Sequence, residues 1–165
     1  MKASLKTVFL SAIVAVLVVC FFRIDFMEVR ILGDSEGIRL SEACKGDIAD
    51  AFEGAGIKNG FSKFTRIVGF IAAGISVLCV IEALTESDDQ KAGSTLCVAA
   101  GAMSAAYGCL TANAFILGKN FKDKAKDYSD TIAAAIKYNP TSACYIMLVL
   151  AAGLLLFTYK DSKSV

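Results

Sequence analysis

The sequence has no histidine, no tryptophan and a single proline in 165 residues. Without histidine there is no imidazole metal ligand, no Ser–His or Cys–His nucleophile pair and no imidazole pH switch. The 17 basic and 16 acidic residues leave a formal net charge of +1, so the chain lacks the basic surface that binds nucleic acid. The low proline and the 13 glycines exclude collagen-like and low-complexity chains.

Hydrophobic residues, by contrast, make up 56% of the chain, and its mean hydropathy is +0.59. The excess over the usual 45–50% or so gathers in four runs, at residues 7–22, 65–84, 94–118 and 142–158. A bilayer-spanning helix needs about 17–25 apolar residues, so the last three runs qualify and the first is marginal. The sequence therefore predicts a multi-pass membrane protein in contact with the lipid bilayer.

The first run, preceded by Lys2 and Lys6, also has the length and flank of a secretory signal peptide. It ends in Val-Val-Cys-Phe-Phe-Arg at residues 18–23, without the small residues of a cleavage site. We expect a retained first helix; cleavage would leave three spans.

The membrane orientation follows from where the basic residues lie. With both termini cytoplasmic, the outer segments carry more basic residues than the inner ones, which favours the opposite arrangement. However, acidic residues balance the long first loop, residues 23–64, whereas Lys2 and Lys6 directly precede the first helix. We favour cytoplasmic termini and, among membranes, the plasma membrane.

The third run carries small residues at intervals of four, beginning at Gly93, and a second such series lies beside it. Small side chains let membrane helices approach closely. A smaller version in the second run includes Gly69, Ala72 and Ser76. We predict close packing within a four-helix bundle, or alternatively an oligomer contact, at Gly93, Cys97, Gly101, Ala105 and Gly108. In either case Asn113 is expected to form a hydrogen bond between helices.

Directly after the first run, apolar and charged residues alternate over residues 23–31, with one slip at Phe26 and Met27. This predicts a strand with a bulge, a turn at residues 33–37 and a second strand at 38–40. The alternative is an amphipathic continuation of the first helix. The charged side chains of the first strand form a possible partner contact: Arg23, Asp25, Glu28 and Arg30.

Two further loop helices are predicted. One extends from Ser41 to Glu53, with Ile48 and Phe52 facing inward. The other lies within residues 119–141, where apolar residues recur at helical spacing from Phe121 to Ile136. It either prolongs the third span or lies along the membrane interface, and ends before Asn139-Pro140. The loop between spans two and three is short, so those two helices are antiparallel neighbours.

Motifs for chemistry are missing. There is no Gly-x-Ser-x-Gly, no phosphate-binding loop and no paired carboxylates on a membrane face. Five of the six cysteines lie in or beside apolar runs, and only Cys44 lies in a loop, where cross-linking to another subunit is a minor alternative. Glu82, near the end of the second span, is expected at the interface. We therefore predict no catalytic, cofactor or metal site, no enzyme activity and no small-molecule substrate.

The layout resembles the claudin, peripheral myelin protein and amastin group of tetraspan proteins. The shared features are the four spans, a strand-like segment after the first helix, a long first loop and the run Tyr-Asn-Pro-Thr-Ser-Ala-Cys-Tyr at residues 138–145. The tryptophan and paired cysteines of the claudin loop and the amastin cysteine signature are absent, so no functional residue of the family carries over. The resemblance implies a protein that assembles laterally in the membrane.

Together these patterns predict an all-α membrane protein, residues 1–165 forming one four-helix transmembrane bundle with a small extramembrane β-hairpin and helix cap. The expected function is structural: self-association or organisation of a membrane assembly. The alternative is an accessory subunit of a channel, transporter or other large membrane complex. A channel of its own would require Glu82 and Asn113 to face one water-filled cavity.

Overall fold

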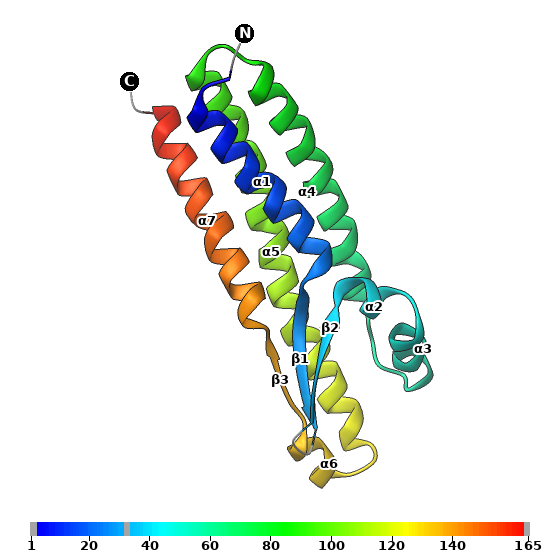
Figure 1. Ribbon diagram of the computed structural model, residues 1–165. Coiled ribbons are helices and arrows are strands. Elements are labelled where there is room, and N and C mark those ends of the chain that lie inside the picture. Colours follow the sequence, from blue (N-terminus) through cyan, green and yellow to red (C-terminus); the bar gives the residue numbers. More distant parts are fainter. Residues whose placement is uncertain (1–2, 32–33, 164–165) are drawn as a thin grey trace. The chain divides into compact units, whose positions relative to one another are not determined.

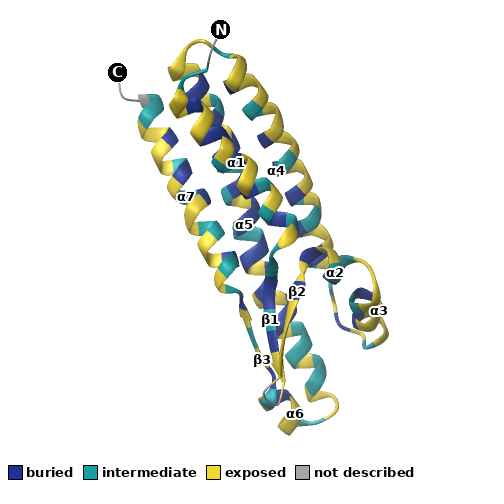
Figure 2. Cartoon of the chain, in the orientation of Figure 1, coloured by how far each residue is buried: buried dark blue, intermediate teal, exposed yellow. Residues whose placement is uncertain are grey.

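The computed structural model describes residues 3–31 and 34–163 and is 78% helical. Its long helices are α1 (Leu5–Arg23), α4 (Gly60–Thr85), α5 (Asp89–Lys126) and α7 (Ser142–Lys163) (Figure 1). Each is long and apolar enough to cross a membrane, and only 22–39% of each apolar segment is buried inside the molecule (Figure 2). Four candidate spans among the described residues indicate an integral membrane protein, at the places that the apolar runs predict.

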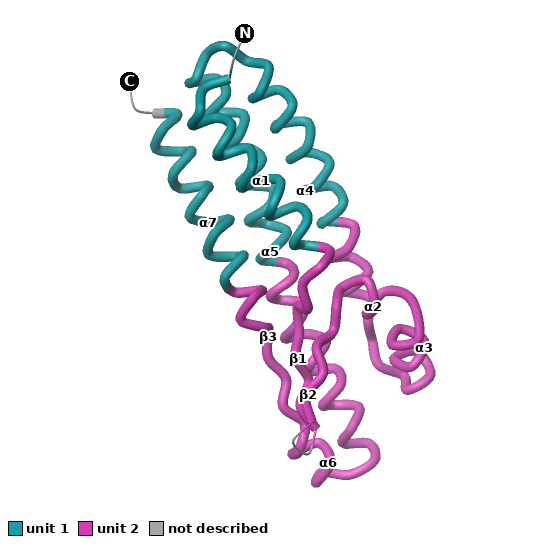
Figure 3. The backbone as a smooth tube through the Cα atoms, in the orientation of Figure 1, with its two compact units in different colours: residues 1–21, 68–108, 146–165 teal, residues 22–67, 109–145 magenta. Residues whose placement is uncertain are grey.

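The chain divides into two compact units (Figure 3). The helical unit, residues 1–21, 68–108 and 146–165, contains nearly all of α1 and large parts of α4, α5 and α7. The sheet unit, residues 22–67 and 109–145, contains the strands, the short helices and the remaining parts of α4, α5 and α7. Every contact described below lies within one unit.

The strands of the sheet unit are β1 (Asp25–Ile31), β2 (Asp34–Arg39) and β3 (Lys137–Pro140), in the order β2-β1-β3 and antiparallel throughout. The register between β1 and β2 shifts between Asp25 and Met27, which confirms the predicted bulge. An amphipathic continuation of the first helix is therefore wrong. The turn predicted at residues 33–37 is wrong for residues 34–37, because these already belong to β2. Gly33 lies outside the described residues.

A third strand was not expected. The loop after the third span was predicted as one helix, and α5 does continue to Lys126. The chain then turns at Ser129, whose side chain accepts a hydrogen bond from the backbone N–H of Thr131 (3.2 Å) and caps α6 (Asp130–Ala135). The segment after α6 forms β3, which pairs with β1. Its C-terminal residue is Pro140, and edge strands tolerate proline.

The helix predicted between residues 41 and 53 is split into α2 (Leu40–Cys44) and α3 (Asp47–Gly54). Gly46 separates them with φ of +102°, a left-handed conformation that glycine adopts without steric cost. Phe52 is buried as predicted, Ile48 is half-buried, and Asp47 is exposed.

Candidate functional site

Helix α5 makes contacts with each of the other long helices. In the helical unit, the Tyr107 hydroxyl donates a hydrogen bond to the carbonyl of Leu17 on α1 (2.7 Å), and the Ser76 hydroxyl of α4 donates to the carbonyl of Ala99 (3.4 Å). The buried residues of α5 alternate at spacings of three and four, the pattern of helices packed side by side. One row with this spacing consists of Ala92, Leu96, Ala99, Met103, Ala106, Leu110, Asn113 and Leu117, and further buried residues, among them Ala100, Tyr107 and Ala114, lie beside it.

The predicted assembly residues follow a different course along α5. Gly93 is buried, and a Cβ added there would lie 3.4 Å from Oδ2 of Asp161. Cys97, Gly101 and Gly108 are half-buried, and Ala105 is exposed. From Gly93 to Ala105 the steps are of four residues, and each advances about 40° around a helix, so these four residues turn progressively away from the side on which Gly93 is buried; Gly108 follows Ala105 after three residues.

These residues are less closely packed within the chain than the series predicts. A Cβ on Gly101 would meet Leu155 at an ordinary 3.7 Å, and one on Gly108 would meet nothing within 4 Å. Their role in contacts with another copy stays a prediction.

Among the described residues, two glycines lie directly against aromatic rings, and one of them is Gly69 of α4. A Cβ on Gly69 would overlap the ring of Phe21, which packs edge-on against Tyr107 with ring centroids 5.4 Å apart. In the sheet unit, Gly118 is equally close to the ring of Tyr138. The small-residue series of the second run includes Gly69, but nothing in the sequence indicates that aromatic rings cover these two glycines.

Asn113 is fully buried in the sheet unit. Its Oδ1 accepts a hydrogen bond from the Ser62 hydroxyl at 3.1 Å, which links α5 to α4 as predicted. Among the described residues its Nδ2 has no hydrogen-bond partner. Glu82 is exposed in the helical unit.

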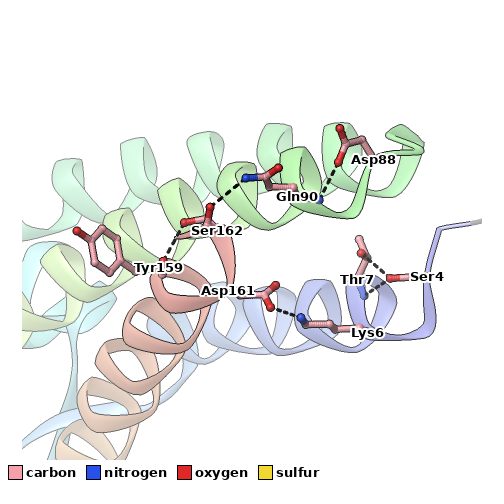
Figure 4. A network of polar contacts seen from close by, with 8 residues as sticks. All are labelled: Ser4, Lys6, Thr7, Asp88, Gln90, Tyr159, Asp161 and Ser162. Atoms are coloured by element: carbon pink, nitrogen blue, oxygen red, sulfur yellow. Dashed lines mark hydrogen bonds and ion pairs between the residues drawn. The ribbon is translucent and has the colours of Figure 1, made fainter. Parts of the chain in front are cut away.

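Polar contacts join three helices near the chain termini (Figure 4). Lys6 of α1 forms an ion pair with Asp161 of α7. Gln90, in the first turn of α5, donates from Nε2 to the carbonyl of Ser162 (3.3 Å), and its backbone N–H donates to Oδ1 of Asp88 (2.9 Å). These contacts bring both terminal helices to the same end of the helical unit as the α4–α5 connection.

The charged residues predicted as a partner contact lie at the start of the sheet unit. Glu28 accepts a hydrogen bond from Nε of Arg30 (2.9 Å), which lowers the pKa of the Glu28 carboxyl and raises that of the Arg30 guanidinium. Asp25 pairs with Nε of Arg39 (3.2 Å), and Arg23 is exposed at the end of α1. Their contact with a partner stays a prediction.

All six cysteines lie in the described part of the chain, and none forms a disulfide there. Cys44 is half-buried, and its burial raises the pKa of the thiol although the positive charges of Arg66 and Lys63 act in the opposite direction. Across residues 3–31 and 34–163, no group of three Cys, Asp or Glu side chains is arranged to hold a metal ion.

Comparisons of the chain with protein-family models, with curated proteins and with solved structures find no match. The resemblance to claudin-like tetraspan proteins is not tested by them and stays a prediction.

Proposed function

We propose that this chain is a structural membrane protein that crosses a bilayer four times as a helix bundle and associates laterally with further copies of itself. Among membranes we favour the plasma membrane. The resemblance to claudin-like tetraspan proteins agrees with a role in lateral assembly, and the absence of catalytic motifs from the sequence agrees with a structural role.

One observation carries the self-association. On α5, the small residues Cys97, Gly101, Ala105 and Gly108 are left half-buried or exposed. In lipid there is no hydrophobic drive between helices, so association depends on close backbone approach at small residues. The open space around Gly108 and the exposure of Ala105 leave room for a helix of a second copy.

The proposal is tested by the native mass of the protein after mild extraction from its membrane. The wild type is expected as a discrete homo-oligomer. Ala105→Leu and Gly108→Leu place a bulky side chain in the proposed contact and are expected to shift the protein towards the monomer without loss of fold. The matched control is Gly153→Leu on α7, where an added Cβ also meets nothing within 4 Å.

Each other outcome contradicts the proposal. A monomeric wild type excludes self-association. A single complex with a larger, different protein makes this chain an accessory subunit. If the oligomer is unchanged by Ala105→Leu and Gly108→Leu, as by the control Gly153→Leu, its contact does not lie at these residues of α5.

A further inference from the structure

The sheet unit contains an apolar cavity of about 440 Å³. Sites for small molecules have volumes of about 300–1,000 Å³ and are lined mainly by hydrophobic and aromatic side chains. The rings of Phe52 and Phe121 meet edge-on in the wall, with centroids 6.2 Å apart. The other apolar side chains of the wall come from β1, β2 and α3: Val29, Ile31, Ile38, Ile48 and Ala51.

The charged groups that line this cavity are all acidic. Asp34 and Glu36 alternate along β2 and line the cavity, and none of the described lining residues is basic. Both carboxylates are exposed, and neither forms an ion pair with a described residue. An apolar occupant can therefore fill the cavity and place a positive charge beside two carboxylates.

A second apolar cavity of about 370 Å³ adjoins the first, because Ile31 and Phe121 line both. The basic group at its edge, Lys124, already pairs with Asp127 at 2.7 Å. The apolar surface thus continues past Phe121 into a cavity that neither Asp34 nor Glu36 lines, as an unbranched chain attached to a charged head requires.

We propose that this cavity binds an amphiphilic organic cation: an alkylammonium whose head lies beside Asp34 and Glu36 and whose chain extends along Phe52 and Phe121. The carboxylates select the positive head over a neutral or negative one, and the apolar wall binds the chain through hydrophobic contact. This site is separate from the small residues of α5 that carry the proposed self-association.

The test uses the full chain in phosphatidylcholine nanodiscs at neutral pH, with three probes of equal length: n-octylammonium, n-octanol and n-octanoate. Because the chain has no tryptophan, Phe121→Trp introduces a single tryptophan at the cavity, whose fluorescence can be excited selectively at wavelengths where tyrosine absorbs little. The shift in thermal unfolding of the unsubstituted chain gives a second measure of binding that does not depend on this replacement. The expected order of affinity is ammonium, then alcohol, then carboxylate.

Asp34→Asn with Glu36→Gln is expected to weaken octylammonium binding about tenfold, which corresponds to about 1.4 kcal/mol, and to leave octanol binding unchanged. The matched control, Asp47→Asn with Asp50→Asn, neutralises two exposed carboxylates of α3 that do not line the cavity, and should bind as the wild type does. Ala51→Phe fills the cavity and should abolish binding of all three probes.

Three results would overturn the proposal. The first is octanoate binding as tight as that of octylammonium. The second is octylammonium binding that stays unchanged when Asp34 and Glu36 are neutralised. The third is binding that persists in Ala51→Phe, because the probe would then lie in the lipid or elsewhere on the protein.

Discussion

Single residues determine how closely α1, α4 and α5 pack in the helical unit. Phe21 lies against Gly69 on one side and against Tyr107 on the other, and the Tyr107 hydroxyl is bound to a carbonyl of α1. Phe21 and Tyr107 are both fully buried. A side chain at position 69 therefore has no free space to occupy.

We predict that Gly69→Ala destabilises the protein, since its methyl group would overlap the Phe21 ring. Overpacking of this kind costs about 1–3 kcal/mol. The measurement is thermal unfolding of the purified protein in mild detergent. Gly74→Ala is the control on the same helix, because an added Cβ there meets nothing within 4 Å. Equal unfolding temperatures for the two variants would contradict the packing described for Phe21.

A second prediction concerns Cys44. Burial raises the pKa of its thiol, so less thiolate is present at neutral pH, and the thiolate is the reactive form. Alkylation of Cys44 by iodoacetamide should be slower than that of an exposed cysteine and should keep rising to more alkaline pH. The comparison is Ser41→Cys in a Cys44→Ser chain, with the rate followed by peptide mass against pH. Arg66→Gln removes a charge that lowers the pKa and should slow Cys44 further.

The opposite result, a Cys44 that reacts as fast as the cysteine at position 41 with the same pH profile, would contradict the burial of this thiol. It would also favour cross-linking to another subunit, which the sequence left open.

Among elements, α4 and α5 are joined in the sheet unit by a hydrogen bond between the side chains of Ser62 and Asn113. Ser62→Ala leaves Asn113 buried without this partner, and hydrogen bonds between membrane helices contribute about 0.6–2 kcal/mol. Ser62→Ala combined with Asn113→Leu removes both polar groups, a change that is nearly neutral when the shapes match. We therefore expect the double variant to be at least as stable as Ser62→Ala alone.

Stability is measured by unfolding in detergent. Ser104→Ala is the control, because Ser104 donates its hydrogen bond to Ala100 within α5 (2.8 Å). A double variant less stable than Ser62→Ala would show that Asn113 has a further stabilising contact.

Elements with strong periodicity could be predicted from the sequence. The apolar runs correspond to the long helices, and the slip at Phe26 and Met27 corresponds to the bulge of β1. The strand β3 could not be predicted, because its four residues end in a proline, give no alternating pattern and are ordered by pairing with β1. The break between α2 and α3 depends on the positive φ of Gly46. A single glycine in the sequence does not indicate which φ it adopts.

Which side of α5 is buried could not be predicted from the sequence either. A helix that faces lipid is apolar on its outer side as well as its inner side, so hydropathy does not distinguish the two. The spacing of small residues suggested steps of four from Gly93, whereas burial alternates three and four from Ala92. No sequence pattern indicates the cavity beside Asp34 and Glu36, because its lining residues come from distant parts of the chain: β1, β2, α3 and α5.

At the scale of the whole molecule, the proposed lateral assembly requires that the long helices cross a membrane. Their outward side chains are large and apolar, as at Leu78 and Val149, both 69% exposed, and such surface is stable in lipid. If each long helix crosses the bilayer once, the chain termini and the α4–α5 connection face one side of the membrane and the connection between α1 and α4 faces the other. The sequence favours the cytoplasm for the termini.

The most direct measurement is labelling of single cysteines in intact cells with a membrane-impermeant thiol reagent. In a chain whose six native cysteines are replaced by serine, Ser41→Cys and Ser87→Cys each provide a single exposed thiol, before α4 and after it. The account predicts that the cysteine at position 41 is labelled from outside and that the one at position 87 reacts only after the membrane is permeabilised. Labelling of both from the same side would contradict a membrane crossing by α4 and, with it, the four-span account.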